Sequence, residues 1–371
     1  YTMVEAIANS IEDKLIEGLE FTHKPTAKYV TDRKSVTWFP SGASTYTPVG
    51  GPKVIKIRLN SDDWLDPSTV KLQYTLNNDD NTNAMTLLSS GWEWFKRLRV
   101  ICQGQVVEDI DDYNRIHQMF HMFSSEGVSR NTSIEGTLQW DEGIAETIAA
   151  SGKRHMSVKL LSGLLNQEKW LPLRYAPIEI ELELVNNVAD CQTGSTAWSL
   201  TDVQIKGDVC TLDNQMANDY SNILLSGRAL DINYGTFISQ NQVVTNSTFS
   251  VNISRAVSRL KSLFVSMEGA PHANNTTYLK EFNNFWHPMS VTNGVYDSSK
   301  EAEIQIQIGS KLFPEYPQRS IAETFSQLKK CLGVHESPFH SLNINGRQYR
   351  NYKFVAGFDT EKVISAGYTG L

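Results

Sequence analysis

Residues 178–184 decide the fold, and they read Ile-Glu-Ile-Glu-Leu-Glu-Leu. Apolar and acidic residues alternate strictly, so every second side chain points to the same face of an extended chain. This pattern is typical of a strand with one face in a core and one in water, as in antiparallel sandwiches.

The three glutamates of this strand, Glu179, Glu181 and Glu183, share its other face at a spacing of about 7 Å. They would repel one another unless they are solvated or paired with Lys or Arg on a neighbouring strand, so we expect a wet outer face or a subunit contact. Glycoside hydrolases use paired carboxylates, and because that pairing is spatial, the sequence leaves the alternative open.

The same period of two recurs through the first half of the chain. The predicted strands are Lys53–Leu59, Val70–Leu76, Phe95–Cys102 and Val203–Leu212. Turn residues at Asp66-Pro67 and Asn77–Asn81 are predicted to interrupt them. The densest basic stretch, residues 96–99, is interleaved with apolar residues and is predicted to form one face of a strand.

Two helices are predicted between these strands. Residues 112–124 place Ile116, Phe120 and Phe123 on one face, and residues 215–225 form a short connector that ends at Ser226-Gly227. We expect the domain boundary at Gly227.

The second half begins the strand pattern again. Its predicted elements are strands at Leu230–Ser239, Thr248–Ile253, Leu260–Met267 and Ala302–Ile308, a helix at Ile321–Leu332 that stops at Gly333, and hairpin-type turns at Asn293-Gly294 and Asn345-Gly346. This half is shorter in strands than the first, and a sandwich needs further strands to cover its sheet edges. We therefore expect the natural chain to continue past Leu371, and its start at Tyr1 also suggests trimming.

An amphipathic, acidic helix is predicted over the first twenty residues, where Val4, Ile7, Ile11, Leu15 and Leu19 recur at helical spacing. It would dock on its own domain or reach a neighbouring subunit. The predicted organisation is an N-terminal helix and arm in residues 1–50, a first roll with its connector helix in 51–226, and an incomplete second roll in 227–371.

Composition narrows the class of protein. The 371 residues are 40% hydrophobic and 20% charged, which is globular, and the net charge of −7 argues against binding nucleic acid phosphates. Cys102, Cys191, Cys210 and Cys331 form no CxxC pair and are predicted to be free thiols. No run approaches the length of a membrane span, and no signal peptide is visible.

Catalytic and metal-binding patterns are weak. His117 and His121 lie four residues apart on the predicted helix, but Gln118 stands where a zinc protease needs Glu, so they are interpreted as polar rings on a half-exposed face. Asp62, Asp63 and Asp66, or residues 77–81, lack the ligand spacing of a calcium loop and are interpreted as turns. No nucleotide or nucleophile motif occurs. We therefore assign no catalytic, cofactor-binding or metal-binding residue and expect no enzyme activity.

Two aromatic clusters allow two interpretations. Trp92, Trp94 and Phe95 form one, and Phe282, Phe285 and Trp286 form the other. Exposed, they would stack on sugars; buried, they would belong to sandwich cores, which we favour because large aromatics dominate cores and interfaces.

Short stretches resemble the double jelly-roll major capsid proteins of tailless membrane-containing phages, adenoviruses, virophages and polinton-like viruses. The stretches are Trp64-Leu65-Asp66-Pro67-Ser68-Thr69, Trp170-Leu171-Pro172-Leu173, Lys311-Leu312-Phe313-Pro314-Glu315-Tyr316-Pro317 before a helix, Phe354–Val363, and Tyr368-Thr369-Gly370-Leu371. The order of secondary-structure elements is similar along nearly the whole chain, whereas the amino-acid sequence is similar only in these stretches.

The resemblance implies an all-β fold of two consecutive eight-stranded antiparallel jelly rolls with inserted helices. It implies a homotrimer of pseudo-hexagonal outline that tiles an icosahedral shell in the virion, beside neighbouring capsomers, penton and minor capsid proteins, with an internal membrane beneath. The alternatives are a carbohydrate-active or carbohydrate-binding two-domain β-sandwich protein and a surface adhesion module.

Overall fold

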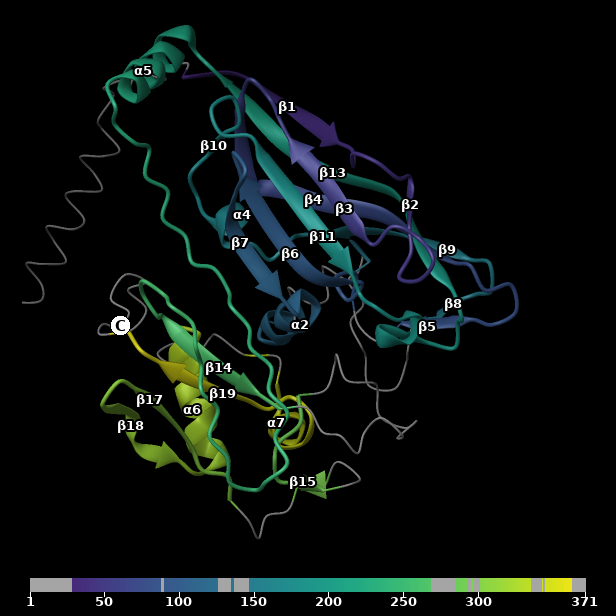
Figure 1. The fold of residues 1–371 in the computed structure, drawn as a ribbon, viewed down its shortest axis with the longest axis vertical. Helices are drawn as coiled ribbons and strands as arrows, with labels where there is room; N and C mark the ends of the chain where they lie inside the picture. The colour runs from purple at the N-terminus through teal and green to yellow at the C-terminus, as the bar shows by residue number, and fades with distance from the viewer. Residues whose placement is uncertain are drawn as a thin grey trace, which may run out of the picture.

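The computed structural model describes residues 29–87, 90–125, 135–136, 147–267, 285–291, 295–296, 301–334, 342 and 344–361. The predicted N-terminal helix of residues 1–20 lies outside these residues. Figure 1 shows a large β-sandwich from the first half of the chain and a smaller group of strands and helices from the second half.

Two sheets make up the sandwich. The larger contains β1 (Val30–Trp38), β2 (Thr45–Tyr46), β4 (Trp64–Asn78), β9 (Lys153–Val158), β10 (Leu171–Pro172) and β13 (Trp198–Leu212). The smaller contains β3 (Val54–Leu59), β6 (Phe95–Cys102), β7 (Gln105–Asp111) and β11 (Ile178–Leu184). A third, small sheet contains β5 (Met85–Leu87), β8 (Thr147–Ile148) and β12 (Gln192–Thr193).

Strand pairing in the sandwich is nested. Taken in chain order, its eight main strands are β1, β3, β4, β6, β7, β9, β11 and β13. The first pairs with the last (β1 with β13), the second with the seventh (β3 with β11), the third with the sixth (β4 with β9) and the fourth with the fifth (β6 with β7). All four pairs are antiparallel. A chain folded double in this way and rolled into two facing sheets is a jelly roll. The first half therefore has the predicted fold.

Inward-facing residues of both sheets form one core cluster. Along β3 every second residue is buried, and Ile57, Ile180 and Leu98 from three adjacent strands are fully buried. Tyr74 of the larger sheet meets Phe95 of the smaller edge-on, with ring centroids 5.7 Å apart. The alternation that predicted these strands is thus the alternation between core and surface.

Two features of the sandwich differ from the sequence prediction. β4 runs straight through Asp66-Pro67, which was predicted to interrupt it. The pairing of β4 with β13 shifts between Lys206 and Asp208, and the Thr69 hydroxyl oxygen accepts the Asp208 N–H there at 2.8 Å, so a side chain replaces a ladder bond. Strand β1, in the predicted arm, was also missed, because its outward residues are polar and its period is weak.

Helices of the first half are α2 (Tyr113–Met122), α4 (Gly163–Asn166), the 3-10 helix η2 (Val188–Asp190) and α5 (Asn214–Leu225). Both predicted helices are confirmed: α2 follows β7, and α5 ends at Leu225, with Ser226 as its C-cap and then Gly227 with a φ of 78°. Only glycine adopts that φ readily, which explains the stop. Gly227 as a domain boundary stays a prediction.

The second half contains β14 (Ser262–Ser266), β15 (Ser290–Val291), β16 (Val295–Tyr296), β17 (Ile304–Ile308), β18 (Lys311–Gln318), α6 (Ile321–Cys331), α7 (Gly346–Asn351) and β19 (Val355–Asp359). The predicted strands at 260–267 and 302–308 and the helix at 321–332 are confirmed. β15 and β16 pair antiparallel on either side of the predicted turn, whose residues 292–294 lie outside the described part. Asn345-Gly346 is no hairpin turn, because Asn345 caps α7 through a reciprocal pair of hydrogen bonds with Gln348.

Predicted strands at residues 230–239 and 248–253 are wrong as hydrogen-bonded strands. The structure describes residues 228–261 as an extended chain outside any sheet. In the first roll, the first and second strands pair with the eighth and seventh. Among the described residues of the second half, the pairs β14–β19 and β17–β18 correspond to strands three with six and four with five. The described part of the second half thus repeats the inner part of the nested order without completing eight strands.

Candidate functional site

Helix α2 joins the two halves of the chain (Figure 1). Its Phe120 ring meets Phe264 of β14 edge-on at 5.5 Å between centroids, and Met119, Met122 and Phe123 belong to the core cluster of the second half. Arg115 places its guanidinium carbon 4.4 Å from the ring centroid of Phe285. This junction, formed by α2 with β14 and residues 285–287 and 353–354, is one described contact between the halves.

The opposite face of α2 carries the two histidines singled out in the sequence. The His117 ring stacks on Trp92 at 4.1 Å with planes 16° apart, and the His121 ring tilts on the same indole at 4.7 Å. His117 Nδ1 lies 3.1 Å from the Tyr113 hydroxyl oxygen. Both rings are half-buried and packed on an aromatic residue, which is compatible with their interpretation as polar rings of a helix face.

Burial keeps these imidazoles neutral. It lowers the pKa of His117 well below the usual 6.5, with a further lowering by the charge of His121. Burial, followed by the charge of Lys353, lowers the pKa of His121 to about 4. His287 in the second half is 4% exposed, and burial lowers its pKa to about 4 as well. Among the described residues, no group of three or more His, Cys, Asp or Glu gathers to hold a metal ion.

The glutamate row of β11 is paired across the sheet. Glu181 is 8% exposed and forms ion pairs with Lys56 of β3 and, at 3.5 Å, with Arg99 of β6. Register places Lys56 and Arg99 directly opposite it on the two neighbouring strands. The row is therefore a cross-strand ion ladder, and the expected wet face holds for the half-buried Glu179 and Glu183 but not for Glu181.

Aspartates of the predicted turns form hydrogen bonds and ion pairs with nearby residues. Asp80 accepts the backbone N–H groups of Thr82, Asn83 and Thr196 at 2.8 to 3.0 Å and the side-chain amide of Asn83 at 3.0 Å. These donors, with the Asn83 side chain first, lower the pKa of Asp80. Asp63, in the bend before β4, pairs with Lys34, which is compatible with the turn interpretation. Asp66 pairs with Arg33 from within strand β4, so its interpretation as a turn residue is wrong.

Both aromatic clusters are buried where the structure describes them. Trp92 and Trp94 are at most 2% exposed, and Phe285 and Trp286 are at most 4% exposed, whereas Phe282 lies outside the described residues. The core interpretation is confirmed for these side chains. All four cysteines are free thiols, as predicted, and Cys191 and Cys210 are buried.

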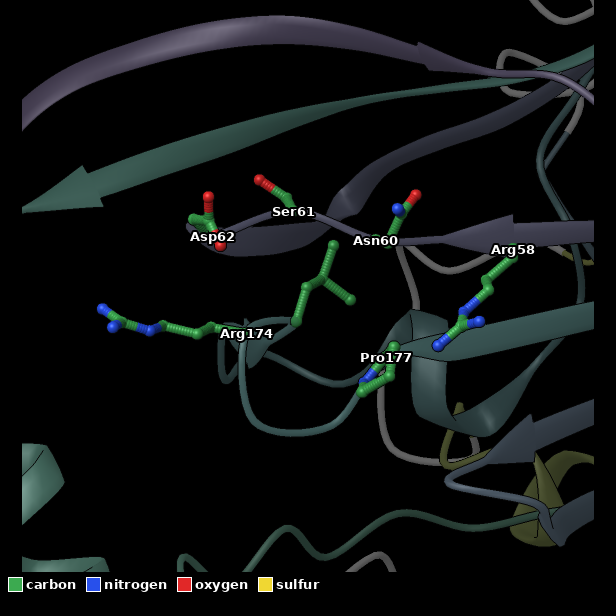
Figure 2. A pocket seen from close by; sticks show the side chains of 7 residues that line it. Arg58, Asn60, Ser61, Asp62, Arg174 and Pro177 are labelled. Carbon is green, nitrogen blue, oxygen red and sulfur yellow. The ribbon is translucent and has the colours of Figure 1, made fainter.

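A shallow pocket lies at one end of the sandwich, between the β3–β4 and β10–β11 connections (Figure 2). Its lining residues are Arg58, Asn60, Ser61, Asp62, Leu173, Arg174 and Pro177. Figure 2 shows the side chains of Arg58 and Arg174 far apart and pointing in different directions. The two guanidinium groups therefore do not converge on one ligand.

Sequence reasoning missed two features. Glu108 is 2% exposed, accepts the Gly163 N–H at 2.8 Å and binds the Ser162 hydroxyl, so it anchors the start of α4. Burial raises the pKa of Glu108 despite these hydrogen bonds. No periodicity marks such a residue, because its partners lie more than fifty positions away.

The second missed feature is the exposed apolar surface of residues 238–257. Its large exposed side chains are Ile238, Val243, Val244, Phe249, Val251, Ile253 and Val257. No Asp, Glu, Lys or Arg occurs between Asp231 and Arg255. The start of this surface and the residues before it are held to the edge of the first roll, where the Tyr234 hydroxyl donates to the Val107 carbonyl at 3.2 Å and the Ser239 hydroxyl to the Asp111 carbonyl at 2.7 Å. A segment with so many exposed apolar side chains and so few charges is typical of an interaction site.

No helix in the described part of the chain is long and apolar enough to cross a membrane.

No protein-family model matches the sequence, and no curated protein matches it either. Among solved structures, the chain is similar to the PBCV-1 virus capsid at 13% identity and a TM-score of 0.38, over 54% of this chain and 47% of that chain. It is similar to the STIV MCP at 12% identity and a TM-score of 0.45, over 88% of this chain and 92% of that chain. The Faustovirus major capsid protein aligns at 7% identity and a TM-score of 0.28, over 52% and 56%. The match with the PBCV-1 chain thus spans about half the length of that chain.

Proposed function

We propose that this chain is a major capsid protein that forms trimers of pseudo-hexagonal outline and tiles an icosahedral viral shell. The observation that carries the proposal is the strand order. A complete nested jelly roll is followed in the same chain by the inner pairs of a second nested order.

Helix placement supports the repeat. In the first half, α2 lies between the fifth main strand, β7, and the sixth, β9. In the second half, α6 lies between β18 and β19, which hold the fifth and sixth places. The extended residues 230–253 come before β14, where a first and second strand would lie. Two similar units in one chain turn a threefold assembly into a ring of six similar units, which fills a hexagonal lattice.

The surface supports a protein that works through contacts between chains. The apolar surface of residues 238–257 is uncharged over most of its length. Strand β1 lies at the edge of the larger sheet in the described pairing, and its first residues are exposed. Unpaired edges and exposed apolar segments associate readily with other protein chains.

Charge supports a shell that does not neutralise its genome. The net charge of −7 and the ion pairs that use Lys56, Arg97 and Arg99 leave no dense basic surface in this sheet. We therefore propose copies of the same chain, neighbouring capsomers, and penton and minor capsid proteins as partners, with an internal membrane beneath the shell. Direct contact with nucleic acid is not part of the proposal.

The carbohydrate alternative has lost the sequence feature that favoured it. Sugar stacking needs exposed aromatic faces, and Trp92, Trp94, Phe285 and Trp286 are buried. The glutamate row, which suggested glycoside hydrolysis, is an ion ladder within a sheet. Nothing in the described residues favours a hydrolase or a lectin over a structural subunit.

Native mass spectrometry and light scattering of the purified chain test the proposal, together with negative-stain electron microscopy. We expect a trimeric mass and particles of hexagonal outline, or larger assemblies built from them. A monomer at all concentrations that binds glycans on an array would overturn it.

A further inference from the structure

The outer edge of β7 is covered by the chain that follows α5. In the described pairing, β7 is the last strand of the smaller sheet. The Tyr234 hydroxyl donates to the Val107 carbonyl at 3.2 Å, and the Ser239 hydroxyl donates to the Asp111 carbonyl at 2.7 Å. Residues 231–241, which we call the strap, therefore follow this edge on the way from α5 past α4 and β7 to the second half (Figure 1).

The strap covers the edge without pairing with it as a strand. Its side chains Ile232, Tyr234 and Phe237 pack against the core of the first roll, as the inward side chains of a strand do. Among the described residues, however, its backbone forms no hydrogen bond with the backbone of β7. The hydrogen bonds to β7 come from side chains of the strap, so the outward backbone groups of this edge are available to a true strand once the strap leaves.

One glycine of α4 sets how closely the strap approaches. A Cβ on Gly163 would lie 1.8 Å from the Gly235 carbonyl oxygen, so the strap crosses α4 where a side chain is missing. Gly163 is held in place there, because its N–H donates to the buried Glu108 carboxylate at 2.8 Å. A Cβ on Gly235, by contrast, would meet nothing within 4 Å. Closure of the strap thus depends on glycine at position 163 and not at position 235.

A segment with the chemistry of a strand lies exposed in the same chain. Phe249, Val251 and Ile253 alternate with polar residues, and all three side chains are exposed. The segment is uncharged, so it would bring no like charge beside the acidic residues of β7. The Gln240 side chain donates to the Asn252 carbonyl at 2.9 Å, so the chain between them is a loop with its ends together at the surface. This loop presents its strand pattern to other molecules.

We propose that the strap is an autoinhibitory cover: it keeps the edge of β7 closed, and once it lifts, this edge accepts residues 248–253 of a second copy as an added strand. Backbone hydrogen bonds to β7 would hold the added strand, and its apolar side chains would lie over the core where those of the strap now lie. The proposal concerns one edge of the first roll and stands whether or not the chain assembles into a shell.

The cover should act on affinity through the population of the open edge. A partner that binds only the open form has its apparent affinity reduced in proportion to the fraction of open chains. Gly163→Ala places a methyl group against the Gly235 carbonyl and should displace the strap. Gly235→Ala adds a methyl group at the same crossing, where it has free space, and is the matched control.

Opening of the strap is measured by limited proteolysis with chymotrypsin, which cleaves after Tyr234 and Phe237 when these half-buried side chains are released. We expect cleavage at these residues to be at least about tenfold faster in Gly163→Ala than in the wild type, and unchanged in Gly235→Ala. The double variant Tyr234→Phe, Ser239→Ala removes both hydroxyl bonds to β7 and leaves α4 intact, and it should accelerate cleavage by about threefold to tenfold. Hydrogen exchange in β3 and β11 shows whether the first roll stays folded, and if Gly163→Ala disturbs it, the double variant decides.

A fluorescent peptide of residues 247–255 represents the second copy, and its binding to the full chain is followed by fluorescence anisotropy. We expect the peptide to bind Gly163→Ala at least about tenfold more tightly than the wild type or Gly235→Ala, and to protect amides of residues 105–111 from exchange. The same peptide with Val251→Pro lacks one backbone N–H and should not bind. Equal affinity for all three chains, protection at β1 in place of β7, or faster strap cleavage without tighter binding would overturn the proposal.

Discussion

Phe120 on α2 packs edge-on against Phe264 on β14, with ring centroids 5.5 Å apart and planes at 80°. The two residues lie on opposite sides of the predicted domain boundary at Gly227. Phe237 and Phe123 complete the contact around the same rings. An inserted helix of the first roll thereby supplies part of the core of the second half.

Truncation of Phe120 should weaken this contact. Phe120→Ala removes a half-buried ring and its edge-on contact with Phe264, so we expect the free energy of unfolding of the second half to fall by about 1–2 kcal/mol. Denaturant unfolding followed by hydrogen exchange in β14 and β11 measures it, with the larger loss in β14. Phe39→Ala is the control, since that ring is 68% exposed and its removal should change little. Equal effects of both substitutions would contradict the role of Phe120.

In the ion ladder across β3, β11 and β6, two glutamates of the same strand should differ in what they contribute to stability. Glu181→Gln removes the charge that both Lys56 and Arg99 share, so we expect a loss of about 1–2 kcal/mol in urea unfolding. Glu179→Gln, two positions earlier on the same half-wet face, should cost much less. If Glu179→Gln is as costly as Glu181→Gln, the ladder is not the source of the effect.

Close packing of α6 on β19 should make Gly357 intolerant of a side chain. A Cβ at Gly357 would lie 2.9 Å from Cys331 Sγ and 3.0 Å from Leu328 Cα. Gly357→Ala should therefore destabilise the second half by about 1–3 kcal/mol in thermal or urea unfolding. Gly346→Ala, at the start of α7, is the control, because a Cβ there has nothing within 4 Å and alanine favours helix. An unchanged stability of Gly357→Ala would show that α6 shifts freely.

Deletion of residues 1–20 should separate folding from assembly. The sequence of this segment predicts an acidic amphipathic helix, and β1 begins only at Val30. We expect the shortened chain to stay folded by circular dichroism and to assemble less by light scattering. Loss of soluble, folded protein in this deletion would contradict the prediction.

Sequence periodicity predicted the sandwich well where each strand has one wet face. β11, β6 and β3 follow the predicted ranges because alternate burial leaves a period of two in the sequence. It failed for the segment at 230–253, which carries a strand pattern but has no pairing partner among the described residues. A strand pattern describes which face a side chain takes, and pairing depends on a second segment that the pattern does not contain.

The sequence by itself determined that this protein is rich in antiparallel sheet and where most strands and helices of the first half lie, and it favoured a core position for the aromatic clusters. The reason is that alternate burial leaves a period of two residues in strands and of 3.6 residues in helices. The tertiary structure decided the nested pairing of the strands, the burial of Glu181 between two cations, and the packing of the His117 and His121 rings on Trp92. Each of these joins residues far apart in the chain. Their partners are chosen by packing and charge across the folded molecule, so no local pattern could specify them.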